Sequence, residues 1–91
     1  AVTHHFARLQ FAAGDAKKAM KTLERGWALA PHPDLATLYL GASGETEALK
    51  RVGVVRRLAG QNPADIESHL ALARASLDAG LWGEARRHLD A

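Results

Sequence analysis

The sequence contains no cysteine, few aromatic residues and no long apolar run. The absence of cysteine excludes disulfides, thiolate nucleophiles and cysteine-ligated zinc. Aromatic residues make up only 5% of the chain, which favours helices in close contact through small side chains over a sheet packed on large rings. No apolar run approaches the roughly 18 to 20 residues that a membrane-spanning helix needs, and no signal peptide is visible. We therefore expect a soluble chain.

Neither sign of charge is in large excess. Twelve Lys and Arg residues against ten Asp and Glu residues give a net charge of +2, which does not demand a nucleic-acid partner. The length of 91 residues and the 47% hydrophobic content suit one small domain spanning the whole chain. Because the chain begins and ends inside helical patterns, we expect it to be a fragment of a longer protein.

What the sequence does have is an internal repeat. Four landmarks recur at one constant offset, as the pairs Phe6/Leu72, Gly14/Gly80, Ala19/Ala85 and Leu23/Leu89. This offset falls two positions short of two repeat units of roughly 34 residues each. Pro31 and Pro63 are likewise two positions closer than one such unit, so the missing pair falls in the middle unit, between Leu40 and Lys50. The predicted repeats are residues 1–33, 34–65 and an incomplete 66–91.

Helical spacing and turn residues predict five to six antiparallel helices. Four span about residues 2–13, 16–29, 35–42 and 45–59; a fifth follows Asp65 and ends before Gly80, and a sixth runs from Trp82 to the chain end. Gly14, Gly44 and Gly80 are expected to reverse the chain. The N-caps are predicted to be Asp15, Asp34 and Asp65.

Two sets of apolar residues at helical spacing are expected to face inward, namely Phe6, Leu9 and Ala13, and Leu49, Val52, Val55 and Leu58. Further apolar stripes are Ala19, Met20, Leu23 and Trp27; Leu70, Ala73 and Leu77; and Ala85 and Leu89. Gly53 weakens its helix by about 1 kcal/mol relative to alanine. It either allows close packing or is simply tolerated.

These positions resemble the tetratricopeptide repeat over essentially the whole chain. Leu72-Ala73 stands where the family has leucine and a small residue, and Ala85 with Leu89 matches its A-x-x-x-F pair. The middle unit departs from the family, with Arg51 in place of the packing alanine. The resemblance implies an all-α fold, a right-handed solenoid of about three helix hairpins, in which small residues let neighbouring helices approach.

A narrower resemblance is to the C-terminal tetratricopeptide region of bacterial HemY proteins. It rests on PHPDLATLYL (31–40), LKRV (49–52) and NPADIESHLALARASLDAGLWGEARRHLDA (62–91). HemY proteins are inner-membrane proteins associated with porphyrin and haem metabolism, with membrane helices upstream of this region. The resemblance thus implies a parent protein at the bacterial inner membrane, with this domain on the cytoplasmic side. Another bacterial tetratricopeptide protein is the alternative.

No motif indicates an enzyme, and no cofactor is expected. Neighbouring residues His4 and His5 point about 100 degrees apart on a helix and cannot share a metal as an i, i+4 pair would. His32 lies between prolines, and His69 and His88 are expected on different helices. Single imidazoles without carboxylate clustering are usually surface residues, so a haem or metal carrier is the least favoured function. Gly41-x-x-Gly44 lacks the Gly-Lys-Ser/Thr of a phosphate loop and is predicted to be a turn.

Basic residues recur on the second helix of each hairpin. They are Lys17, Lys18, Lys21 and Arg25; Lys50 and Arg51; Arg56 and Arg57; and Arg86 and Arg87. Such a stripe could bind nucleic-acid phosphates. The alternative, a solvated outer face, is favoured because acidic residues are interspersed and no aromatics are interleaved for base stacking.

The function that the sequence favours is a protein-interaction scaffold. In the resembled family the first helices of the hairpins line a concave groove, which implies ten partner-binding residues here: His4, Arg8, Phe11, Leu35, Leu38, Ala42, Glu67, Leu70, Arg74 and Leu77. The equivalent Arg8 and Arg74 beside an apolar strip suit an extended or helical peptide with leucine-like anchors and a carboxylate. The alternative is that neighbouring hairpins of the longer protein cover these leucines.

The two ends of the repeat array are predicted to be uncovered. Phe6 and Leu9 have no preceding hairpin to pack on, and Leu72, Trp82 and Leu89 are expected to be exposed at the other end. Exposed apolar patches promote association. We therefore expect the chain to self-associate, or to borrow a helix from a neighbouring molecule, through one of these ends, and we expect any such dimer to reflect truncation more than biology.

Overall fold

The computed structural model describes residues 2–90 and contains six α-helices in that range, with no strand. The helices are α1 (Val2–Ala12), α2 (Ala16–Leu29), α3 (Pro33–Ser43), α4 (Ala48–Ala59), α5 (Ile66–Asp78) and α6 (Trp82–Leu89). The all-α prediction is therefore confirmed. The predicted bounds hold within two residues, except that α4 begins three residues late.

Glycines in the left-handed conformation end three of the helices. Gly14, Gly44 and Gly80 have φ angles of 83°, 69° and 75°, a conformation that costs other residues free energy. They follow α1, α3 and α5 respectively. The predicted reversals of the chain at these glycines are confirmed.

Side-chain caps fix where the helices start. Asp15 accepts a hydrogen bond from the Lys18 amide, and Asp65 accepts one from the Glu67 amide, so both predicted caps are confirmed. The prediction for Asp34 is wrong. His32 caps α3 instead, because its Nδ1 accepts the Asp34 amide at 3.1 Å and Pro33 occupies the first helical position, where a missing amide proton costs nothing.

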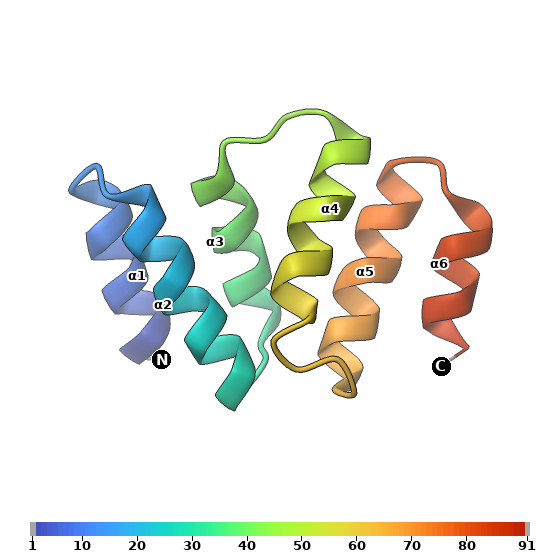
Figure 1. Ribbon diagram of the computed structural model, residues 1–91, viewed down its shortest axis with the longest axis horizontal. Coiled ribbons are helices and arrows are strands. Elements are labelled where there is room, and N and C mark those ends of the chain that lie inside the picture. The colour runs from blue at the N-terminus through green and yellow to red at the C-terminus, as the bar shows by residue number, and fades with distance from the viewer. Residues whose placement is uncertain (1, 91) are drawn as a thin grey trace.

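The helices lie side by side along the long axis of the molecule, from α1 at one end to α6 at the other (Figure 1). Each helix contacts the next in sequence, and α1, α2 and α3 also contact α3, α4 and α5 respectively. The described part of the chain measures 38 × 26 × 15 Å. Its packing is thus built from near neighbours in sequence.

Two apolar clusters form the core. The first contains Ala7, Leu23, Trp27, Leu35, Tyr39 and Leu58, and the second contains Val52, Val55, Ala59, Leu72 and Ala75. The large ring of Trp27 is fully buried at the centre. Small residues such as Ala7, Ala19 and Ala85 are also buried, which allows the helix backbones to approach closely.

Several predicted inward residues are exposed. The inward-face prediction for residues 2–13 is wrong: Phe6 and Leu9 are 54% and 55% exposed and Ala13 is exposed, whereas Ala7 is buried. The exposure of Phe6 and Leu9 agrees instead with the prediction that this end of the array is uncovered. In α4 the prediction for Leu49 is wrong, since it is 65% exposed. In each case the apolar stripe is wider than the contact that the neighbouring helices provide.

Leu72 shows the opposite error. It is buried in the second cluster, so the prediction that it is exposed at the end of the array is wrong. It packs on the preceding helix α4 and needs no following hairpin. Trp82 and Leu89 are exposed as predicted.

Candidate functional site

An open groove lies mainly between α3 and α5, and it has a volume of about 640 Å³. Its wall residues from these two helices are Pro33, Ala36, Thr37, Leu40 and Gly41 of α3, and Glu67, Leu70, Ala71, Ala73, Arg74, Ala75, Leu77 and Asp78 of α5. Ala48, Arg51 and Val55 of α4 and Leu89 of α6 also contribute, and Trp27 reaches it from α2. The groove therefore joins residues from five helices.

One face of α5 supplies the groove's exposed anchors. Leu70 and Leu77, two turns apart on α5, are both partly open to solvent and line the groove, with Arg74 between them. Leu72 packs against α4 on another face of the helix, so the groove face is held outward. Four of the ten predicted groove residues, Glu67, Leu70, Arg74 and Leu77, therefore line this groove.

The α3 wall uses different residues from those predicted. Leu35 and Ala42 are buried, and Leu38 packs against the first core cluster. The groove face of α3 is instead small and partly polar, with Thr37 and Gly41 one turn apart.

The cause of the different face is a shift in register between α3 and α5. Burial matches the two helices through the pairs Leu35/Ser68, Tyr39/Leu72 and Ala42/Ala75, which share one common offset. That offset is one position longer than the spacing of Pro31 and Pro63. The prediction that Leu38 and Leu70 are equivalent depends on the proline spacing. Because His32 rather than Asp34 caps α3, Thr37 takes the place that the sequence assigns to Leu38.

The remaining predicted residues lie elsewhere. Arg8 and Phe11 are exposed on α1 and do not line the groove. The His4 side chain lies outside the described part of the chain. The second arginine of the groove is Arg51 of α4, which sequence reasoning missed, although its occurrence at an alanine position of the repeat was a visible signal.

The groove carries charges of both signs. Arg51 donates a hydrogen bond to the Glu45 carbonyl at 3.3 Å, so its side chain is partly held. Among the described residues, Arg74, Glu67 and Asp78 form no ion pair with one another or with other side chains. These three groups are therefore available to a polar partner.

A chain of hydrogen bonds, buried at Trp27 and Ser68, fixes α5 beside the groove. The Trp27 indole donates to Ser68 Oγ at 2.8 Å, and Ser68 Oγ donates to the Asn62 carbonyl at 2.6 Å. The Asn62 side-chain amide in turn donates to the Ala28 carbonyl at 3.4 Å. These bonds join α2, the α4–α5 loop and α5, so the groove wall has a defined position.

Glu84 on α6 is the centre of the second polar cluster. Its carboxylate contacts His88 at 3.2 Å, Arg56 of α4 at 3.2 Å, and Arg87. The hydrogen bond from His88 and the charges of Arg87, His88 and Arg56 lower the Glu84 pKa, although partial burial opposes them. This carboxylate links α6 to α4 through the Arg56 side chain.

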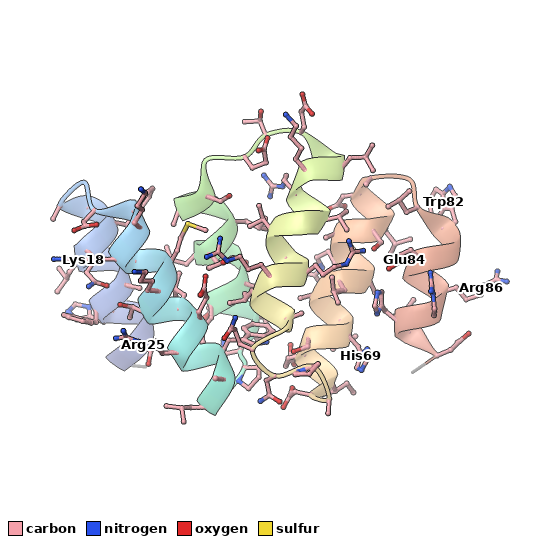
Figure 2. All side chains as sticks on the ribbon, in the orientation of Figure 1. Lys18, Arg25, His69, Trp82, Glu84 and Arg86 are labelled. Atoms are coloured by element: carbon pink, nitrogen blue, oxygen red, sulfur yellow. The ribbon has the colours of Figure 1, made fainter. Side chains whose placement is uncertain are left out.

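Two of the histidines come together on α5 and α6. The His69 and His88 rings have centroids 5.9 Å apart, and Figure 2 shows His69 on α5 and Glu84 on the neighbouring helix α6. No group of three or more histidine and acidic side chains within residues 2–90 has a metal-binding arrangement. The His69 and His88 rings thus form a contact between α5 and α6.

Half of the Lys and Arg residues of α2, α4 and α6 pair with acidic ones. Arg57 lies 3.5 Å from Glu24, and Lys18 and Lys50 pair with acidic residues in their own helices or caps. Lys18 and Arg25 both lie on α2 (Figure 2). The outer surface is thus mixed in charge.

No helix within the described range is both long and apolar enough to cross a bilayer. The chain was also compared with known proteins. It matches no family model, no curated protein and no solved structure.

Proposed function

We propose that the chain is a tetratricopeptide-like solenoid of three hairpins, α1–α2, α3–α4 and α5–α6, that acts as a protein-interaction module without catalytic activity. The contacts between near-neighbour helices support this interpretation. So do the small buried residues at repeat positions, such as Ala7, Ala73 and Ala85. The proposed ligand is a peptide segment of a partner protein.

The observation that carries the proposal is the groove between α3 and α5. Its α5 wall exposes Leu70 and Leu77 on either side of Arg74. Grooves of this kind bind extended or helical segments through apolar anchors spaced along one face. Isolated exposed leucines need no explanation, but two exposed leucines in one groove mark a binding surface.

The charges of the groove define the ligand's chemistry. Arg74 and Arg51 lie on the groove wall together with Glu67 and Asp78. A ligand with leucine-like anchors and a carboxylate between them would place the carboxylate against Arg74, where a guanidinium can form two parallel hydrogen bonds. A basic residue in the ligand would pair with Asp78 or Glu67.

The resemblance to the HemY region extends the proposal to a biological setting. It would place the module in a membrane-associated parent protein linked to porphyrin and haem metabolism. In that setting the groove would recruit or regulate partner proteins near the inner membrane. The residues of the groove carry the binding proposal independently of this setting.

The test begins with selection from a displayed library of random peptides on the purified chain. We expect enriched peptides to carry leucine-like residues and an acidic residue. Fluorescence anisotropy with one labelled peptide then gives its Kd. Leu70→Glu and Arg74→Glu should each weaken binding about tenfold or more, because they place a charge in the apolar strip or reverse the charge beside it.

Matched controls lie outside the groove. Leu29→Glu changes an exposed leucine at the end of α2, and Arg25→Glu changes an exposed arginine on the same helix. Both should leave Kd unchanged. The proposal is wrong if no peptide is enriched, or if the groove and control variants affect binding equally.

A labelled oligonucleotide in the same assay tests the nucleic-acid alternative. Salt-dependent binding that Arg25→Glu weakens would support that alternative. The ion pairs of Arg56, Arg57 and Lys18 with neighbouring acidic groups argue against it.

A further inference from the structure

One kind of helix contact occurs twice in the molecule. In the second core cluster, Val52, Val55 and Ala59 of α4 hold Leu72 and Ala75 of α5, with Ala79 packed beside them. In the first cluster, Leu23 and Trp27 of α2 pack with Tyr39 of α3. The second helix of one hairpin thus receives an apolar stripe from the first helix of the next.

Helix α1 carries the same apolar stripe, and no helix within residues 2–90 covers it. Phe6, Leu9 and Ala13 stand at the repeat positions of Leu72, Ala75 and Ala79, and all three pairs share the offset that separates Gly14 from Gly80. All three α1 residues are exposed. The inward side of α1 is formed by Ala7 and Gln10, whose amide oxygen accepts a hydrogen bond from Thr22, so the stripe faces away from the rest of the chain.

Helix α6 has the position in its hairpin that α4 has in the preceding one. None of the described helices packs an apolar stripe on the corresponding face of α6. Arg86 and Leu89 follow Val52 and Val55 of α4 at one equal spacing, which is that of a full repeat unit. A shallow hollow of about 370 Å³ surrounds Leu89, and its walls are Leu77, Trp82, Ala85, Arg86, Leu89 and Asp90. Trp82 is 71% exposed, and both Trp82 and Arg86 lie on α6, at the opposite end of the molecule from α1 (Figure 2).

We propose that the α6 face binds α1 of a second copy of this chain, head to tail, and so forms the α4–α5 contact a third time between molecules. The Phe6 ring would enter the hollow beside Leu89 and Trp82. Arg86 replaces Val52 at the rim, where its aliphatic stem can cover an apolar neighbour and its guanidinium can lie over the Phe6 ring. The hollow has room for the Phe6 ring, which is larger than the Leu72 side chain that packs in the corresponding place on α4.

The proposed contact joins two different surfaces, so it does not close at two molecules. Each bound copy still offers a free α6 face at one end and a free α1 stripe at the other. Such heterologous association continues into open chains unless the rotation closes a ring. A symmetric dimer would stop at two molecules, because the same surface of both partners would be buried in the contact.

Light scattering across a concentration series measures the association. We expect the weight-average mass of the chain to rise continuously from 9.8 kDa and to pass that of a dimer. Phe6→Glu and Leu89→Arg should each abolish the rise, because each removes one of the two surfaces. Their mixture should form one-to-one dimers and nothing larger, since the intact α6 face of the first variant binds the intact α1 stripe of the second.

Matched controls are Phe11→Glu, an exposed phenylalanine on another face of α1, and Leu29→Arg on α2. Both should associate as the unchanged chain does. Circular dichroism checks that the variants remain helical, and Phe6→Gln and Leu89→Gln provide uncharged versions of the same test. The proposal is overturned if the chain stays monomeric at high micromolar concentration, if either variant still associates, or if the mixture does not pair. Leu89 also lines the groove between α3 and α5, whereas Phe6 lies outside it, so the Phe6 variants test the contact between copies independently of the groove.

Discussion

Ser68 and Ser76 lie on the same helix and are both buried, but only one has hydrogen-bond partners. Ser68 Oγ accepts the Trp27 indole N–H and donates to the Asn62 carbonyl. Ser76 Oγ has no partner among the described residues. Removal of the Ser68 hydroxyl leaves the buried Trp27 N–H without an acceptor, so its desolvation cost is no longer offset. Removal of the unpaired Ser76 hydroxyl breaks no hydrogen bond.

These two serines give a matched pair of substitutions. Ser68→Ala should lower the free energy of unfolding by about 1–3 kcal/mol, because it leaves the Trp27 indole without an acceptor in the core. Ser76→Ala should be neutral or slightly stabilising. Urea denaturation followed by circular dichroism measures both values. Equal effects of the two substitutions would contradict the assigned hydrogen bonds.

Individual residues also show how far the sequence predicts the groove. Glu67, Leu70, Arg74 and Leu77 line it as expected, because Asp65 caps α5 as predicted and so fixes the phase of that helix. Arg51 was missed because repeat matching assigns a small packing residue to its position. A charged residue there can only point away from the core, which opens that position to the groove.

At the scale of the helices, two glycines inside helices differ in their surroundings. A Cβ added at Gly53 of α4 would meet no atom within 4 Å. At Gly26 of α2 it would overlap Thr3 Cγ2 of α1. Gly26 thus allows α1 and α2 to approach, whereas Gly53 has no such role, which decides between the two explanations offered for it.

Alanine at these positions should therefore have opposite effects. Gly53→Ala should raise the free energy of unfolding by about 0.5–1 kcal/mol, because alanine costs less entropy in a helix. Gly26→Ala gains the same propensity but forces α1 away, at a cost of about 1–3 kcal/mol, and should be destabilising overall. Thermal unfolding compares the two with the unchanged chain. A destabilised Gly53→Ala variant would show that this face of α4 is covered.

The positions of the helices along the sequence were predictable. The face that each helix turns toward its neighbours was less predictable. Apolar spacing and the three turn glycines place all six elements. The face that α3 presents depends on which residue caps it, and a histidine accepting a backbone N–H through its ring nitrogen is not among the preferred caps. One residue of register changes the exposed face by about 100 degrees, which is enough to bury Leu35 and Ala42.

For the whole molecule, inward and outward faces depend on which helices have neighbours on both sides. Leu72 is buried because α4 precedes it, while its equivalent Phe6 is exposed because α1 is the first helix of the described residues. Periodicity alone gives the two residues the same environment. Burial at the ends of a row of helices is therefore set by position in the row as much as by residue type.

Tyr39 reports on the packing of the whole molecule, because it is the single tyrosine of the chain and lies fully buried between helices. Its hydroxyl donates to Glu24 Oε2 of α2 at 2.6 Å, and Arg57 of α4 lies 3.5 Å from the same oxygen. Burial, followed by the hydrogen bond to Glu24 and the charge of Glu24, raises the Tyr39 pKa well above its ordinary value; the Arg57 charge opposes this only partly.

A raised pKa makes the folded state bind its phenolic proton more tightly than the unfolded state does. The stabilisation is thus complete below the unfolded value of about 10 and is lost as pH rises above it, by about 1.4 kcal/mol per pH unit. We expect tyrosinate absorbance and loss of helical ellipticity to appear together in an alkaline titration, at a pH above the value measured for the chain unfolded in urea. The Tyr39→Phe variant should lose the steep alkaline limb of its stability curve, although it leaves Glu24 without that donor at neutral pH. Tyrosinate that forms near pH 10 while the helices remain intact would mean that Tyr39 is open to solvent, and the junction of α2, α3 and α4 would then be packed differently.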